Sequence, residues 1–298
     1  MAQSAKLDVY DMVTDRIISA LEKGVVPWQK PWQSIGGPRN LQSKRPYRGL
    51  NAFLLALMPY KSPYWTTFRA AKAAGGSVKK GEKGTIVVFW KIMEVDDPQA
   101  KNGKKKIPLL RYYTVFNVEQ CEGLTIPDDK IPEFDPIEEA QNVIDSMQNA
   151  PQINFGGNRA FYAPLDDEVT LPFPEMFESR EAYYQTAYHE LAHSTGHESR
   201  LHRVKDWSRF GSEPYAQEEL VAEMSAAMVL GTIGLEPCVD ESAAYIDGWL
   251  GRLKNDKKLV LKAASQAQKA ADYILGAVED KEDEDSASSS TTKVEVNS

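Results

Sequence analysis

The stretch AYHELAHSTGHESRLHR, residues 187–203, contains every histidine of this 298-residue chain: His189, His193, His197 and His202. Its residues 189–193 read His-Glu-Leu-Ala-His, an HExxH pattern. Residues four apart on an α-helix project from the same face, so both imidazoles can bind one ion. Ser179 is a suitable N-cap and no proline follows it before His193. We therefore predict a helix over about 178–195 that carries a metal site.

Glu190 is the candidate catalytic residue of this motif. When a protein supplies three zinc ligands, the fourth position stays open for water, whose pKa the metal lowers. Glu190 is placed to accept a proton from that water before it attacks a carbonyl group. The motif predicts Zn²⁺ as the cofactor, for which Mn²⁺ or Co²⁺ could substitute. The alternative is a pair of surface histidines that happen to be four residues apart.

The third ligand is less obvious. Gly196 stands where HExxHxxGxxH metalloproteases have their glycine, but the residue three further on is Ser199, and serine is a poor zinc ligand. His197 would share a face with His193 only if the helix continued past Gly196, which we expect to end it. His202 could reach the metal only through a loop.

A second predicted helix, over about 214–230, offers a better ligand. Glu219 and Glu223 are four apart on one face of it. Thermolysin-like zincins complete their site with the first carboxylate of a downstream helix, and a second acid one turn on holds a ligand histidine. We therefore assign the metal ligands as His189, His193 and Glu219. Glu223 is assigned to hold a ligand histidine from outside.

Two alternatives remain for this helix. Glu218 is the fallback ligand, and because it points about 100° away from Glu219, both cannot serve. The acidic positions could also form an ordinary solvated helix face.

Residues 159–172, RAFYAPLDDEVTLP, resemble the strand pair that zincins place beside the active-site helix. An edge strand there could pair with an extended peptide substrate, although a purely structural hairpin fits the pattern equally well. A side chain should also donate a hydrogen bond to the oxyanion of the transition state. The eligible donors are Tyr188, Tyr215, His197 and His202.

Charge divides the chain into two unlike halves. Residues 1–124 hold 20 Lys and Arg against 10 Asp and Glu, whereas residues 125–298 hold 15 against 33. Such asymmetry indicates two modules with different partners. No apolar run is long enough for a membrane span, and the N-terminus lacks a secretory signal pattern. The two cysteines, one in each half, argue against a disulfide framework and favour a cytoplasmic location.

The residue pattern predicts an α+β protein. We expect a small basic α+β domain over 1–124, a linker over 125–135, and a mostly helical zincin-like domain with a small sheet over 136–278. A disordered acidic tail is expected over 279–298. In the first domain the predicted helices are 6–22, 49–58 and 66–74, and the predicted strands are 85–92 and 111–118. In the second, the helices are 136–148, 178–195, 214–230, 240–251 and 255–276, and the strands are 152–155, 159–163 and 168–171.

The basic half interleaves cations with aromatic residues. The stretch PWQKPW, residues 27–32, sets two indoles on a proline-stiffened loop. Cations that follow phosphates and rings that stack on unpaired bases suit single-stranded nucleic acid. The candidate DNA-binding residues are Trp28, Lys30, Trp32, Arg39, Lys44, Arg45, Tyr47, Arg48, Lys79, Lys80 and Lys83. Aromatic residues packed in a core and lysines on a solvated loop are the alternative.

Six stretches give the chain a resemblance to a known family: GVVPWQKPW, RPYRGLN, SPYWTTFRAAKAAGGSVKKGEKGTIVVFW, YTVFNVEQCEGL, HELAHSTGHESRL and EELVAEM. The chain resembles the ArdC antirestriction proteins of conjugative plasmids, from about residue 8 to residue 275. The resemblance implies an N-terminal single-stranded-DNA-binding domain and a C-terminal zincin-like metalloprotease domain of the SprT/Spartan kind. It also implies protection of incoming plasmid DNA from host restriction during conjugation. The family's metal motif falls on His189, Glu190, His193 and the helix of Glu219.

The expected partners are single-stranded DNA and a protein substrate, either a host restriction component or a DNA-bound protein, with no membrane. The alternative function is a non-catalytic protein that coats single-stranded DNA and whose metal site is structural or vestigial. A primase-like or nuclease function fits poorly, because the basic half shows no acidic triad for two metal ions.

Overall fold

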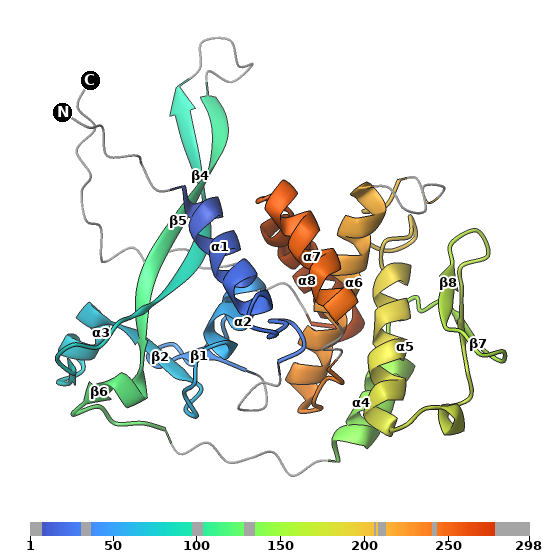
Figure 1. The fold of residues 1–298 in the computed structure, drawn as a ribbon, viewed down its shortest axis with the longest axis horizontal. Coiled ribbons are helices and arrows are strands. Elements are labelled where there is room, and N and C mark those ends of the chain that lie inside the picture. Colours follow the sequence, from blue (N-terminus) through green and yellow to red (C-terminus); the bar gives the residue numbers. More distant parts are fainter. Residues whose placement is uncertain are drawn as a thin grey trace.

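The computed structural model describes residues 8–30, 37–96, 104–127, 135–205, 207, 213–239 and 243–277. The fold is α+β, as predicted, with a sheet and a long hairpin on one side of a helical body and a smaller sheet beyond helix α5 (Figure 1). Among the residues that the structure describes, no helix has the length and apolar content that a membrane crossing requires. The predicted tail over 279–298 lies outside the described residues.

The first half begins with helix α1 (Val9–Leu21), in which Val13, Ile17 and Leu21 recur at helical spacing and are all buried. The N-cap Asp8 accepts a hydrogen bond from the backbone amide of Tyr10. The main sheet of the first half has the strand order β1-β2-β5-β4, and β3 and β6 form a separate pair. The other elements of this half are β1 (Arg39–Asn40), α2 (Leu50–Ala56), β2 (Tyr64–Thr67), α3 (Phe68–Ala73), β3 (Ser77–Val78), β4 (Thr85–Asp96), β5 (Lys104–Asn117) and β6 (Cys121–Glu122).

Strands β4 and β5 form a long antiparallel hairpin that projects from the body (Figure 1). Their register runs from Thr85 opposite Val115 to Asp96 opposite Lys104. Both predicted strands are confirmed, but β4 continues past residue 92 to Asp96, and β5 begins at Lys104 rather than at residue 111. The reason is that cross-strand hydrogen bonds to β4 outweigh the weak intrinsic strand preference of lysine.

The second half is mainly helical. Helices α5 and α6 pack against each other, α8 packs against α6, and a three-stranded sheet in the order β7-β9-β8 lies beside α5. All predicted elements of this half are present with shifts of a few residues at their ends. Their bounds are α4 (Pro136–Ser146), β7 (Gln152–Phe155), β8 (Phe161–Ala163), β9 (Glu168–Leu171), α5 (Arg180–Ser194), α6 (Glu213–Ile233), α7 (Ala243–Asn255) and α8 (Leu259–Ile274).

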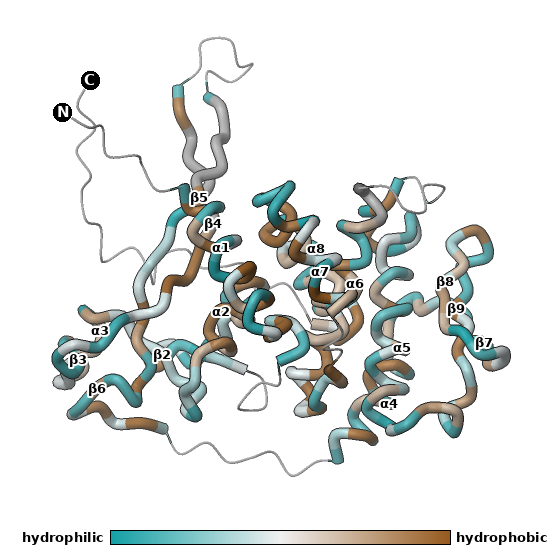
Figure 2. The backbone as a smooth tube through the Cα atoms, in the orientation of Figure 1, coloured by the Kyte–Doolittle hydropathy of each residue, from teal (hydrophilic) through white to brown (hydrophobic). Residues whose placement is uncertain are grey.

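The two halves share one hydrophobic core. Residues of α1 and α2, such as Ile17 and Phe53, belong to the same buried cluster as Leu220 of α6 and Leu253 of α7. In Figure 2 the hydrophobic segments of α6, α7 and α8 lie next to one another and close to α2. An ion pair between Arg48 and Asp272 adds a polar link between the start of α2 and α8. The predicted linker falls largely outside the described residues.

Asn51 of α2 fixes the outer edge of the hairpin. Its side-chain amide donates a hydrogen bond to the carbonyl oxygen of Val88, and its side-chain oxygen accepts one from the Val88 amide, both at 2.7 Å. Asn51 is 7% exposed, and among the strands that the structure describes, β4 is the edge strand of this sheet. Without Asn51, both backbone groups of Val88 would be buried without a partner.

The change Asn51→Ala is therefore expected to lower the free energy of unfolding by roughly 2–4 kcal/mol, because two buried backbone groups lose their partners. Urea denaturation followed by circular dichroism measures the change. Asn154→Ala is the control, since it removes side-chain hydrogen bonds with Gln152 and Glu168 but leaves no buried backbone group without a partner, and it should cost about 1 kcal/mol or less. Equal losses for the two variants would contradict the role given to Asn51.

Candidate metal centre

Helix α5 presents the HExxH motif as the sequence predicts. Ser179 caps its N-terminus by accepting a hydrogen bond from the backbone amide of Ala182 at 3.1 Å. The helix ends at Ser194, just before Gly196. A Cβ atom at Gly196 would lie 2.8 Å from a Val204 methyl group and 3.1 Å from the His193 carbonyl oxygen. Only glycine therefore lets the following loop turn back against the end of the helix.

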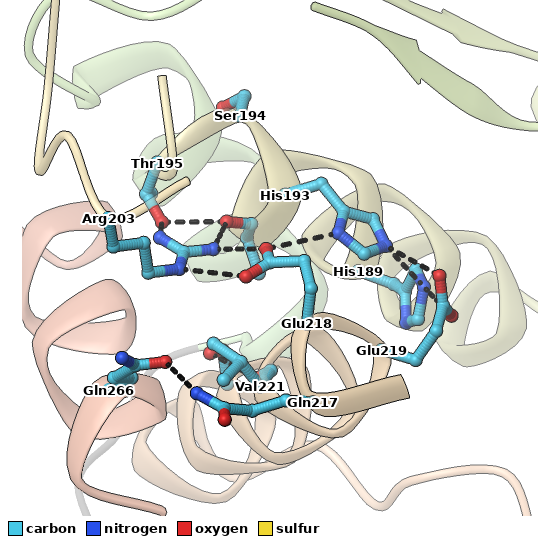
Figure 3. Close-up of polar contacts among 12 residues, drawn as sticks. His189, His193, Ser194, Thr195, Arg203, Gln217, Glu218, Glu219, Val221 and Gln266 are labelled. Carbon is cyan, nitrogen blue, oxygen red and sulfur yellow. Dashed lines mark hydrogen bonds and ion pairs between the residues drawn. The ribbon is translucent and has the colours of Figure 1, made fainter. Parts of the chain in front are cut away.

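Two histidines of α5 and one glutamate of α6 converge on a common point (Figure 3). The Nε2 atoms of His189 and His193 are 3.1 Å apart. The carboxylate of Glu219 lies 3.6 Å from the His189 Nε2 and 3.5 Å from the His193 Nε2. The three ligand atoms all lie within 4.8 Å of one another. Two imidazole nitrogens and one carboxylate at these spacings fit a zinc ion about 2.0–2.2 Å from each ligand.

Acidic groups surround His189. Burial alone would lower its pKa, but the carboxylates of Glu219, Glu190 and Glu223 outweigh burial and raise the pKa of His189. Glu190 itself is buried at 8% exposure. Carboxylates that favour a proton on this imidazole also favour a metal cation beside it.

Glu218 lies behind His193, on the side away from Glu219 (Figure 3). Its Oε1 is 3.2 Å from the His193 Nδ1, so it orients the ring whose Nε2 points to the metal position. Arg203 pairs with the same carboxylate, with contacts of 2.6 and 3.1 Å. Arg203 also donates to the carbonyl oxygen of Ala192 and to the hydroxyl of Thr195, at the end of α5. Glu218 thus occupies the position of an orienting group, and the geometry does not bring it to the metal side.

Sequence reasoning missed the pair of Glu218 and Arg203. The available signal was the adjacency of Glu218 and Glu219: if one faces the metal, the other is left to face the back of a ligand histidine. No sequence pattern pointed to Arg203, because it lies in the loop after α5 and contacts the end of that helix only in the folded structure.

Glu223 lies near His189, the histidine on which its charge acts. It also shares a hydrogen bond with the hydroxyl of Tyr245 on α7. That hydroxyl accepts a hydrogen bond from the Trp28 indole at 3.0 Å. A residue of the first half thus reaches the immediate surroundings of the metal site.

The other histidines lie apart from the three converging residues. His197 contacts the Ser199 hydroxyl at 2.8 Å and faces Asp167, and His202 is exposed. Among the eligible oxyanion donors, Tyr188 is excluded because it is fully buried and donates to the Ala140 carbonyl oxygen. The side chain of Tyr215 lies outside the described residues.

The expectation that Trp28 offers an exposed ring to DNA is wrong. Trp28 is 1% exposed and packs edge-on against Trp249, with ring centroids 5.7 Å apart. Its indole N–H is used by Tyr245, as described above. The proline before Trp28 restricts the backbone and so indicates a fixed position for the ring. Only the tertiary structure shows that this position is inside the core.

The remaining DNA-binding candidates fall into three groups. Four are paired or partly buried: Tyr47 packs against a small core, Arg48 pairs with Asp272, and Lys30 and Arg39 are half-buried. The exposed cations are Lys44, Arg45, Lys79, Lys80 and Lys83. Trp32 lies outside the described residues.

Three exposed rings of the first half were not singled out from the sequence. Phe68 is 57% exposed, Tyr112 is 48% exposed and Phe89 is 37% exposed. Phe68 lies on α3, Tyr112 on β5 and Phe89 on β4. In the hairpin, the alternation of residues along each strand does not reveal which of the two faces is covered.

Comparison with known proteins agrees with this geometry. Residues 138–266 match the family model of a zincin-like metallopeptidase, so the helical half is a zincin-like metallopeptidase domain. Residues 7–116 match the N-terminal domain of anti-restriction factor ArdC. Crystal structures of the antirestriction ArdC protein from the R388 plasmid are similar over nearly the whole chain. The metal-free structure is 41% identical, with a TM-score of 0.73, over 91% of this chain and 98% of that chain.

The Mn(II)-bound structure of the same protein is 39% identical with a TM-score of 0.75, over 92% of this chain and 100% of that one. An uncharacterized protein, y4eC, of Sinorhizobium fredii is 35% identical over 90% of this chain and 91% of its own length. The chain belongs to the ArdC family of antirestriction proteins.

The chain also matches longer proteins. Two DNA primases TraC of Escherichia coli are 35% and 37% identical over 91% of this chain. The chain spans only 20% and 27% of their lengths. Primase activity is therefore a property of those longer proteins and is not carried over to this chain.

The geometry assigns different metal-binding effects to the two adjacent glutamates. Glu219→Ala should abolish stoichiometric zinc binding, because it removes a converging ligand. Glu218→Gln should weaken zinc binding about 10–100-fold, because it disturbs only the orientation of His193. Isothermal titration calorimetry with zinc measures both, and Glu236→Ala at an exposed position is the control. The reverse order of effects would make Glu218 the ligand.

Proposed function

We propose that this chain is an antirestriction protein that protects incoming plasmid DNA during conjugation, by binding single-stranded DNA and acting through a zinc-dependent peptidase-type site. The observation that carries the proposal is the convergence of His189, His193 and Glu219 beside the buried Glu190, in a chain whose other half matches the ArdC N-terminal domain. The Mn(II)-bound relative supports a divalent metal in this fold.

In this proposal each residue of the site has one task. His189, His193 and Glu219 would hold the metal, which when bound supplies a Lewis acid for the scissile carbonyl and acidifies water. Glu190 takes a proton onto its carboxylate from the attacking water and passes it to the leaving amide nitrogen. Glu218, held by Arg203, keeps the His193 ring in the orientation that presents Nε2.

The peptide substrate would lie along the small sheet. In the order β7-β9-β8, strand β8 (Phe161–Ala163) is an edge strand, and it packs beside α5. Its free edge can pair with an extended peptide and bring a carbonyl group to the metal site. The substrate in this proposal is a host restriction component or a protein bound to DNA.

For DNA, the proposal assigns the exposed cations of the first half to phosphate contacts. Lys44, Arg45, Lys80 and Lys83 are exposed, and residues 1–124 carry an excess of basic residues. Phe68, Phe89 and Tyr112 replace Trp28 as the rings available for stacking. Both cysteines are free, which supports the proposed cytoplasmic location.

The alternative is protection by coating the DNA strand, with a metal site that does no chemistry. Glu190→Gln separates the two functions, because it removes the base and leaves the three converging ligands. We expect this variant to bind zinc and single-stranded DNA as the unchanged protein does, and to lose protection of plasmid DNA in conjugation into a restricting host. Efficiency of transfer, compared between restricting and non-restricting recipients, measures the loss. Full protection by the Glu190→Gln variant would favour coating.

Binding to single-stranded DNA should depend steeply on salt, since it rests on phosphate contacts. The double change of Lys80 and Lys83 to Glu is expected to weaken binding at least several-fold and to flatten the dependence of log Kd on log salt, as two cations are lost. Fluorescence anisotropy with an oligonucleotide at several salt concentrations measures both. The same double change at the exposed Lys262 and Lys269 of α8 is the control. Equal effects of the two double changes would remove the assignment of DNA to this surface.

A further inference from the structure

A cavity of about 220 Å³ opens beside the candidate metal ligand His189. Thr186 of α5 lies one turn before His189 and forms one side of it. Ala226 and Ala227 of α6, one turn beyond Glu223, form the other side. Because both alanines have the smallest side chain that still forms a wall, they leave the space between the two helices open. An apolar cavity of about 150 Å³ holds benzene, so this one is large enough for a long side chain.

The first half of the chain closes this cavity. Trp28 and Gln29 both line it, although they precede His189 by about 160 residues in sequence. Trp28 is held rigidly by its hydrogen bond to the Tyr245 hydroxyl and its contact with Trp249. The wall is thus preorganised and is built from the part of the chain that matches the ArdC N-terminal domain.

The opposite rim is also held in place. The side chain of Gln185 bonds the backbone of Cys238 in both directions, with its amide donating at 3.3 Å and its oxygen accepting at 2.5 Å. This contact holds Pro237 at the cavity. The amide of Gln185 is therefore occupied and does not define the chemistry of the cavity.

The charge of the lining is negative. Glu223 is the acidic residue of the wall, and none of the described residues that line the cavity is Lys or Arg. Tyr245 contacts Glu223, but a carboxylate has about four lone-pair sites and keeps room for another donor. Trp28, which is only 1% exposed, closes one wall of the cavity and brings no charge to it. Aliphatic stems of long basic side chains pack well on small apolar surfaces such as Ala226 and Ala227.

We propose that this cavity receives a Lys or Arg side chain next to the scissile bond of the peptide substrate, with Glu223 as its specificity-determining residue. The inference rests on the proposed peptidase function. It adds that the N-terminal half of the chain is part of the substrate site, so cleavage is directed to basic segments of protein, and acidic side chains are excluded.

Hydroxamates that bind a metal and carry one variable side chain test the cavity without requiring turnover. We compare aminobutyl, butyl and carboxyethyl side chains on the full chain loaded with zinc, and measure Kd by calorimetry. The aminobutyl compound should bind about 10-fold more tightly than the carboxyethyl compound, since the Glu223 carboxylate attracts the ammonium group and repels a second carboxylate. Equal affinities, or tightest binding of the butyl compound, would overturn the inference.

Filling the cavity should remove the preference for the aminobutyl over the carboxyethyl compound. Ala227→Leu is expected to reduce the ratio of the two affinities to about two-fold or less, while Ala244→Leu, at an exposed position of α7, should leave it unchanged. Glu223→Gln, which keeps the shape of the cavity, should also reduce the ratio and covers the case in which the Leu variant does not fold. A ratio that stays unchanged in Glu223→Gln contradicts the inference.

Zinc titration of the same samples separates the two levels of the proposal. If zinc binds and the hydroxamates show no side-chain preference, the cavity inference fails and the metal centre stands. If neither zinc nor any hydroxamate binds, the proposed function fails and the inference falls with it.

Discussion

The close packing of α5 against α6 is the constraint on which the rest of this structure depends. It brings Glu219 within 3.6 Å of the imidazole nitrogens of His189 and His193, and it gathers the carboxylates of Glu219, Glu190 and Glu223 around His189. Such a group of like charges is unfavourable unless protons or a cation compensate it. A metal ion held by the three converging residues would supply that compensation. Arg203 balances the one carboxylate, Glu218, that faces away from the metal position. The packing of the two helices thus gives adjacent glutamates different positions: Glu219 faces the metal position and Glu218 contacts the back of His193.

The first half of the chain takes part in the site through its core contacts. Helices α1 and α2 are buried against α6, α7 and α8, and Trp28 is placed between Trp249, Tyr245 and the cavity beside His189. In the proposed function, the first half binds DNA at its exposed basic surface. Its buried contact with the cavity beside His189 would then couple DNA binding to the metal site. The shared core makes separate unfolding of either half unfavourable, since each would expose the apolar residues that the other covers.

Local patterns account for the parts that were predictable. The HExxH spacing, the Ser179 cap and the stop at Gly196 define α5 through contacts within a few residues, and the Glu219 and Glu223 spacing defines the acidic face of α6 in the same way. Predictions failed where a distant partner decides the outcome. Trp28 was expected on the surface because nothing near it in sequence reveals Trp249 and Tyr245, and β5 extends past its prediction because β4 supplies the pairing.

By itself the sequence determined that two histidines share one helix face and two glutamates share a face of a second helix, since this spacing follows from helical periodicity. It also determined the family and the opposite charges of the two halves. Only the tertiary structure showed that Glu219 faces the metal position while the adjacent Glu218 faces Arg203, and that Trp28 is buried in the core. The physical reason is that the rotation of one helix against another, and the burial of a loop, are set by packing between segments far apart in the chain.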